Sequence, residues 1–299
     1  MAFLFIFMDI SECVDAMIRL GFHLSVAGGV QNSALTAEKH RYGTFQIFAS
    51  NPRAWEHHRI KEEDAEAFNG IIKRTGAIPF AHVPYLCNPS SGNKEMLKKS
   101  LQMLIGNMES CNLLKITGLV VHQGSHLGEG SESGVKTIVE TMRKAAELAP
   151  DVRILLENSS GYKNSVGSKF EEIGGIIDKT GSDRIGVCLD TCHAFAAGYD
   201  LSTKEGIADM CKSFEDNIGF KRLGLVHLND AKYGLGSGLD RHWHIGKGNI
   251  GVQGFTELFK NRHFHDGCFI METPINEDGD EASNMRNAKK IVADALGRA

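Results

Sequence analysis

The sequence predicts an α/β fold, a single (β/α)8 TIM barrel with its active site at the carboxyl ends of the strands, and three observations support that prediction. Eight short apolar runs alternate with longer amphipathic segments along 299 residues, and no linker-like stretch divides them. The short runs are continuously apolar, as expected of parallel strands that are buried on both faces. Six consecutive runs end on a His, Asp or Glu, which is where such barrels place their chemistry.

The expected elements follow in chain order from these patterns. The apolar runs predict strands over residues 21–26, 44–49, 78–83, 118–122, 153–157, 185–190, 223–227 and 267–272. The amphipathic segments predict helices over 31–40, 62–75, 94–113, 134–148, 169–179, 204–218 and 251–260, and a last helix over 280–296. A doubly wound open sheet is the alternative, but no Gly-x-Gly-x-x-Gly follows the first run to favour a dinucleotide-binding version.

Composition excludes several classes of protein. The chain is 42% hydrophobic with a formal net charge of −4, and no apolar run approaches the length of a membrane span. Its first residues lack a basic segment and a cleavage site, so we expect no signal peptide. We expect residues 1–16 to form a loose N-terminal extension ahead of one domain over 17–299.

The cysteines indicate a reducing compartment. Their odd number, seven, and the absence of C-x-x-C spacing fit reduced thiols in a cytoplasmic protein. Cys188 and Cys192 flank Asp190, which suggests metal binding, but free cysteines usually behave as small buried hydrophobes and we favour that interpretation.

The third to eighth strands each finish on a potential metal ligand, and three further candidates follow the sixth and seventh strands. The strand-end residues are His82, His122, Glu157, Asp190, His227 and Glu272, and the additional ones are His193, Asp240 and His242. A single His at a strand end is more often structural than a ligand. Four converging carboxylates are different, because without cations they would repel and desolvate at a cost of several kcal/mol each. Lys and Arg are scarce at the strand ends, so the pattern predicts bound metal.

The ligand types indicate which metal is bound and how many ions there are. Five imidazoles and four carboxylates suit Zn²⁺ best, with Mn²⁺ or Fe²⁺ as possible substitutes. If one carboxylate bridges two ions, nine residues supply ten bonds, which leaves three zinc ions with open positions for water or substrate. Open positions are typical of catalysis. Three divalent ions would change the charge from −4 to +2, which favours a phosphate substrate.

Longer stretches of the chain resemble the endonuclease IV family of apurinic/apyrimidinic (AP) endonucleases, zinc enzymes of DNA base-excision repair. The resemblance covers about residues 20–297 and rests on GFHLSVAGGVQNS, FQIFASNPRAW, AHVPYLCN, VVHQGSHLG, LLENSSG, GVCLDTCHAFAAGYD, HLNDAK, DRHWHIGKGNIG and METP. The sixth, seventh and eighth of these are the most specific. The chain departs from the family at Gln123, where Pro is common, and over 159–167, where a Gly-Gln element is usual. Both departures lie on loops that we expect to line the DNA-binding groove, and neither removes a metal ligand.

The resemblance implies a role for each candidate residue. His82, His122 and Glu157 would hold a first zinc. Glu157, the expected catalytic residue, would bridge to a second zinc held by Asp190, His227 and Glu272. The third zinc would be held by His193, Asp240 and His242. Side chains that enter the DNA minor groove would be Arg53, Tyr85 and Leu86.

The same resemblance implies the reaction and its partner. The partner would be double-stranded DNA that contains abasic sites, and a monomer is expected to act on it. The enzyme would hydrolyse the phosphodiester 5′ to the abasic sugar, leaving a 3′-hydroxyl and a 5′-deoxyribose phosphate, and would also trim blocked 3′ ends.

Two other functions are compatible with the pattern. A sugar isomerase or epimerase on a similar barrel would use one divalent ion, so the trio of His193, Asp240 and His242 favours the nuclease. A catalytically inactive protein that binds DNA lesions would bind without nicking, and the complete ligand set argues against it.

Overall fold

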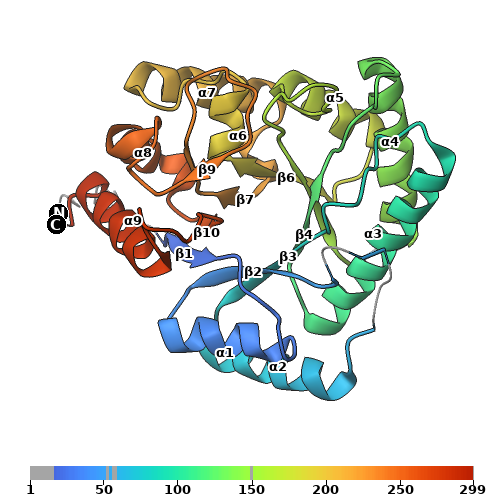
Figure 1. Cartoon of the computed structure of the whole chain (residues 1–299), viewed down its shortest axis with the longest axis horizontal. Helices are drawn as coiled ribbons and strands as arrows, with labels where there is room; N and C mark the ends of the chain where they lie inside the picture. Colours follow the sequence, from blue (N-terminus) through green and yellow to red (C-terminus); the bar gives the residue numbers. More distant parts are fainter. Residues whose placement is uncertain (1–16, 52–53, 56–58, 149–150, 299) are drawn as a thin grey trace, which may run out of the picture.

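The computed structural model describes residues 17–298 apart from 52–53, 56–58 and 149–150, and it confirms the TIM barrel. The parallel strands are β1 (Arg19–Phe22), β2 (Thr44–Phe48), β3 (Ile78–His82), β4 (Gly118–His122), β5 (Arg153–Glu157), β6 (Ile185–Asp190), β7 (Leu223–His227) and β10 (Cys268–Met271). Their order in the sheet is β1-β10-β7-β6-β5-β4-β3-β2, and helices surround them (Figure 1). The expected extension over 1–16 lies outside the described residues.

The helices alternate with the strands as the sequence predicts. They are α1 (Gln31–His40), α2 (Glu62–Thr75), α3 (Lys94–Leu114), α4 (Ser131–Leu148), α5 (Phe170–Thr180), α6 (Thr191–Ala196), α7 (Lys204–Asn217), α8 (Gly251–Lys260) and α9 (Glu281–Ala295), with 3-10 turns η1 (Phe220–Arg222) and η2 (Arg262–Phe264). A two-residue antiparallel pair, β8 (Asp230–Ala231) and β9 (His242–Trp243), lies outside the barrel sheet. Within the described part of the chain, no helix is both long and apolar enough to cross a membrane.

The barrel closes where β1 meets β2. A parallel bridge joins His23 to Gln46, and the Leu24 amide donates to the Gln46 carbonyl at 2.7 Å. Gly21 permits this approach, because a Cβ on it would lie 1.6 Å from the Thr44 carbonyl oxygen.

Strand side chains alternate between the barrel interior and the helix layer. The interior holds a small apolar layer made of Phe80, Val120, Leu155, Cys188, Leu225 and Ile270, together with Cys268. The larger core lies between strands and helices and includes Phe45, Leu119, Leu156, Phe170, Phe255 and Phe269. Each of the first six interior residues precedes an expected ligand by two positions, so the ligands point to the same side, one layer nearer the barrel mouth.

Four expected strands differ from the structure, and two of them, β2 and β3, only by ending one residue earlier. The first begins earlier and ends at Phe22, although the His23 and Leu24 amides still donate to the Met271 and Gln46 carbonyls of the neighbouring strands. The last is β10, which stops one residue before Glu272. The described cysteines are buried and form no disulfide with one another, as expected, and burial raises the pKa of Cys188 and Cys192 to about 12.

Candidate metal centre

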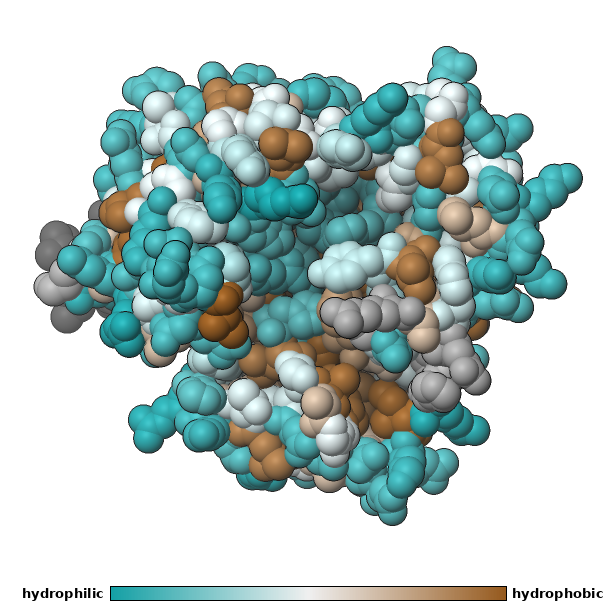
Figure 2. All heavy atoms as spheres, in the orientation of Figure 1, coloured by the Kyte–Doolittle hydropathy of each residue, from teal (hydrophilic) through white to brown (hydrophobic). Residues whose placement is uncertain are grey.

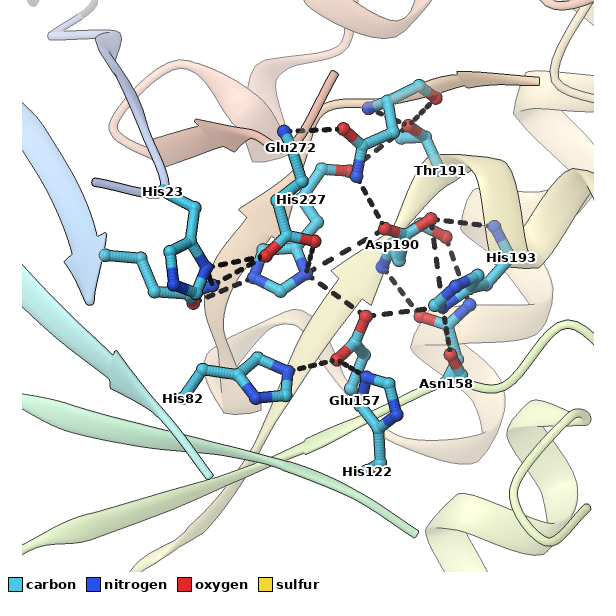
Figure 3. A network of polar contacts seen from close by, with 12 residues as sticks. His23, His82, His122, Glu157, Asn158, Asp190, Thr191, His193, His227 and Glu272 are labelled. Atoms are coloured by element: carbon cyan, nitrogen blue, oxygen red, sulfur yellow. Dashed lines mark hydrogen bonds and ion pairs between the residues drawn. The ribbon is translucent and has the colours of Figure 1, made fainter. Parts of the chain in front are cut away.

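The expected ligands gather at one end of the barrel. The last residues of β3 to β7 are His82, His122, Glu157, Asp190 and His227, and Glu272 follows β10. These side chains point toward one another (Figure 3). In the space-filling view, hydrophilic residues line the hollow in the middle of this face (Figure 2).

Glu157 is the centre of this arrangement and is 2% exposed. Its Oε2 lies 3.1 Å from His82 Nε2 and 2.9 Å from His122 Nε2. Its Oε1 lies 3.1 Å from His227 Nδ1 and 3.2 Å from His193 Nδ1. One carboxylate therefore faces imidazoles on both sides, as a residue shared between two metal ions would.

The side chains form three groups that could each hold a metal ion, with ligand atoms within 4.8 Å of one another. They are His82, His122 and Glu157; Glu157, Asp190, His227 and Glu272; and Asp190, His193 and His242. Asp240 approaches the third group, with Oδ1 3.2 Å from His193 Nε2 and 3.4 Å from His242 Nε2. Asp190, expected in the second group alone, also lies 3.4 Å from His242 Nε2 through its Oδ2.

Two residues of the third group, His193 and His242, lie on short segments outside the barrel sheet. His193 lies on α6, whose N-cap is Asp190; the Asp190 carboxylate accepts from the His193 amide at 2.7 Å. His242 lies on β9, which pairs with β8 directly after β7. The end of β6, the short helix α6 and the two-residue strand β9 thus place three ligands together.

In each of four histidines one ring nitrogen faces other ligands of the centre, and the other nitrogen contacts a backbone or side-chain amide oxygen, to which it can only donate. His82 Nδ1 donates to the Val83 carbonyl at 2.6 Å, and His193 Nδ1 faces the Asn158 carbonyl at 3.0 Å. His227 Nε2 donates to a side-chain amide oxygen at 2.9 Å, and His242 Nδ1 to the Glu272 carbonyl at 3.3 Å. Such outer contacts are typical of imidazoles that bind metal.

The donor set fits metal ions. His193 Nε2 and His242 Nε2 are buried and make no hydrogen bond of good geometry with any described residue. Across the described ranges, no Lys or Arg lies within ion-pair distance of Glu157, Asp190 or Glu272. Buried carboxylates without basic partners and imidazole nitrogens without hydrogen bonds are both satisfied by divalent cations.

The metal-free centre shifts proton affinities strongly. Burial disfavours the charged form of Glu157, but the His122 and His227 imidazoles hold the pKa of its carboxyl well below the usual range. Burial also disfavours imidazolium at His242, yet the Asp190 carboxylate raises the pKa of His242 to about 9. In His82, burial dominates and lowers the pKa. The third group therefore carries protons that a metal would displace.

A cavity of about 460 Å³ opens beside the centre. Its lining includes His122, Glu157, His193, Asp240, Gln123 and Tyr162. Gln123 is buried and its Nε2 donates to the Glu157 carbonyl at 3.1 Å. The loop over 159–167 is bonded to the β4–α4 loop through the Val166 amide and the Gly124 carbonyl at 3.0 Å. The two departures from the family thus lie beside one cavity.

The expected DNA-contacting residues differ in their surroundings. Tyr85 is 65% exposed, and its ring centroid lies 5.9 Å from that of His82 and 5.8 Å from that of His122. Leu86 is half-buried against the hydrophobic core. Arg53 lies outside the described residues.

Sequence reasoning assigned no role to several buried polar residues near the centre, and Gln46 and Asp230 are two of them. Gln46 on β2 contacts His227 and Glu272. Asp230 on β8 accepts from the amides of Ala231, Gly246, Gly248 and Ile250. Gln46 left a detectable signal, a polar residue in the apolar run TFQIF, whereas Asp230 lies on a strand of two residues, too short to show a pattern.

Comparisons with known proteins agree with this geometry. Residues 35–295 match the model of a family described as a xylose isomerase-like TIM barrel. The chain is 42% identical over 279 residues to the probable endonuclease 4 of Cenarchaeum symbiosum, which covers 92% of the chain and all of that protein. Endonuclease IV from Thermus thermophilus is 33% identical with a TM-score of 0.81, covering 94% and 100% of the two chains.

The chain belongs to the endonuclease IV family of AP endonucleases. It is therefore a hydrolase of the DNA-repair nuclease class. A D-tagatose 3-epimerase-like protein, 21% identical with a TM-score of 0.71 over 93% and 97% of the chains, shares the fold alone.

Proposed function

We propose that the protein is a zinc-dependent AP endonuclease of base-excision repair. It hydrolyses the phosphodiester 5′ to an abasic site in double-stranded DNA, leaves a 3′-hydroxyl and a 5′-deoxyribose phosphate, and trims blocked 3′ ends. The observation that supports this most directly is the set of three ligand groups that meet around Glu157 and Asp190. We further propose that residues 17–299 act as one intracellular, monomeric catalytic domain.

The proposed centre holds three Zn²⁺ ions, which Mn²⁺ or Fe²⁺ can replace. The ligands are His82, His122, Glu157, Asp190, His193, His227, Asp240, His242 and Glu272. When bound, the metals would lower the pKa of water toward neutrality and neutralise the phosphate oxygens.

The chain's own residues shape the reaction. Glu157, the proposed catalytic residue, holds two groups at a fixed separation through its two oxygens. The cavity beside it is large enough to take a sugar phosphate, and Asp240 at its rim is open to solvent on one side. Binding a flipped abasic nucleotide there would exclude bulk water and place the phosphodiester against the ligand groups.

We propose that three loop residues contact the DNA. Tyr85 lies at the mouth of the barrel beside two ligands, where an aromatic ring can enter the minor groove. Leu86 is adjacent to it, and Arg53 belongs to the β2–α2 connection. An abasic nucleotide is easier to extrude than a paired one, which gives selectivity without reading of base edges.

The test is a nicking assay on a duplex with one abasic site, with bound metal measured by elemental analysis. We expect about three zinc ions per chain and nicking 5′ to the lesion. Glu157→Gln should lose most of its bound zinc and most of its nicking activity. Glu147→Gln, the same change on the exposed side of α4, should keep both the zinc and the activity. Unchanged rate and zinc content in Glu157→Gln would refute the proposal.

The same measurement separates the alternative functions. A sugar isomerase or epimerase, which the shared fold allows, predicts one ion per chain and no nicking. A protein that binds the lesion without nicking in the presence of zinc would be an inactive binder.

A further inference from the structure

Gln46 is a polar residue at the centre of β2, and its side chain is fully buried. Its register partner on β3 is Phe80, a member of the apolar interior layer. A buried amide without hydrogen bonds would destabilise the fold. In this structure the amide is bonded at both of its polar atoms.

The two polar atoms of Gln46 contact two proposed ligands from different strands. Its Oε1 lies 2.9 Å from His227 Nε2, and its Nε2 donates to Glu272 Oε1 at 2.8 Å. The carboxylate can only accept, so the amide nitrogen must face Glu272 and the amide oxygen must face His227. His227 therefore carries its proton on Nε2.

This orientation determines which ligand atoms face the second group. With Nε2 donating to the amide oxygen, Nδ1 is the nitrogen of His227 left for a metal, and it lies on the side of the group, 3.1 Å from Glu157 Oε1. Glu272 Oε1 is contacted by this amide and by His23 Nδ1 at 3.1 Å, so its Oε2, 3.5 Å from His227 Nδ1, remains for a metal. His23 also contacts this amide, because its Nδ1 lies 2.9 Å from Gln46 Nε2.

We infer that Gln46 is a positioning residue for the second metal ion, because it fixes the tautomer of His227 and the free oxygen of Glu272 through one side chain. The inference rests on the proposed function, since it requires that these two residues bind metal. Outer contacts of this kind usually change metal affinity about 10–100-fold when they are removed.

The experiment compares three variants of the full chain, loaded with zinc. Gln46→Met keeps the size of the side chain and removes its hydrogen bonds to His227, Glu272 and His23. Gln46→Glu keeps an acceptor for His227 but places a second carboxylate against Glu272. Thr44→Val is the matched control, because Thr44 lies on the same face of β2 two residues earlier and its hydroxyl donates to the Ile78 carbonyl at 2.7 Å.

Two measurements follow: zinc retained against a competing chelator, and the ¹⁵N chemical shifts of the His227 ring. We expect Gln46→Met to hold one zinc of three about 10–100-fold more weakly and to lose the defined Nε2–H signal. Gln46→Glu should weaken the same zinc but keep that signal. Thr44→Val should match the wild type in both.

The outcomes are distinguishable. A wild-type protein that takes up no zinc and nicks no abasic duplex would overturn the proposed function together with this inference. Wild-type protein with three zinc ions, and Gln46→Met that retains all three equally with an unchanged His227 spectrum, would overturn the inference alone.

Discussion

Asp230→Asn should destabilise the protein, because Asp230 holds the loop that follows the third ligand group. Its carboxylate is fully buried. Oδ1 accepts from the amides of Ala231 at 2.8 Å and Ile250 at 3.0 Å, and Oδ2 accepts from Gly246 at 3.0 Å and Gly248 at 2.9 Å. Asparagine has one acceptor oxygen, so two of these amides would face an NH₂ group.

The size of the effect follows from those contacts. Hydrogen bonds to a charged group contribute about 1.5–3 kcal/mol each, so the loss of two corresponds to about 3–6 kcal/mol. Burial raises the pKa of Asp230 although the amides of Gly248 and Ala231 oppose the shift, and removing the buried charge offsets part of the loss. We therefore expect a net loss of about 3 kcal/mol in the free energy of unfolding.

The assay is thermal unfolding of the zinc-loaded protein. An unfolding entropy of about 2.1 cal/mol/K per residue over roughly 280 residues gives about 0.6 kcal/mol/K, so the Tm should fall by about 5 °C. Asp278→Asn, the same change at an exposed residue, should alter stability by less than about 0.5 kcal/mol. An Asp230→Asn protein that melts with the wild type would refute the reasoning.

Two further predictions concern metal uptake and DNA contact. Zinc binding at pH 7 should release protons, since a raised pKa keeps His193 and His242 charged in the metal-free protein, and affinity should rise with pH up to about 9, where His242 loses its proton. Calorimetry in buffers of different ionisation enthalpy measures this, and equal heats at pH 7 would contradict it. Tyr85→Ala should weaken binding of an abasic duplex about tenfold with zinc content unchanged, as measured by fluorescence anisotropy, whereas Tyr85→Phe should retain the affinity.

The barrel could be predicted from the sequence because its strands are mostly apolar runs, and from β3 to β7 each run ends on a His, Asp or Glu. The ends of β3 to β7 at His82, His122, Glu157, Asp190 and His227 agree with the expected strand-end residues. A strand buried on both faces tolerates a charged or imidazole residue only where that residue has hydrogen-bond, charge or metal partners. The same residue in the sequence therefore indicates both the end of the strand and a candidate ligand.

Other features could not be predicted because they leave no periodic signal. Six residues of α6, TCHAFA, are too few to show helical spacing. The strands β8 and β9 have two residues each, and their pairing joins segments separated by a Gly-rich loop. Contacts of this kind depend on tertiary structure, which determines that Asp230 faces the amides of Gly246 and Gly248.

These irregular segments also carry the evidence that separates a nuclease from an isomerase. Ligands at the ends of parallel strands are available to any enzyme on this barrel, and the epimerase-like neighbour shares that framework. The third group instead requires His193 on α6 and His242 on β9, neither of which is a residue of the barrel strands. Because β9 pairs with β8 and Asp230 fixes the loop after β9, the group persists only if that hairpin forms. The proposed third metal site therefore depends on α6 and β9, whereas most residues of the other two groups lie at the ends of barrel strands.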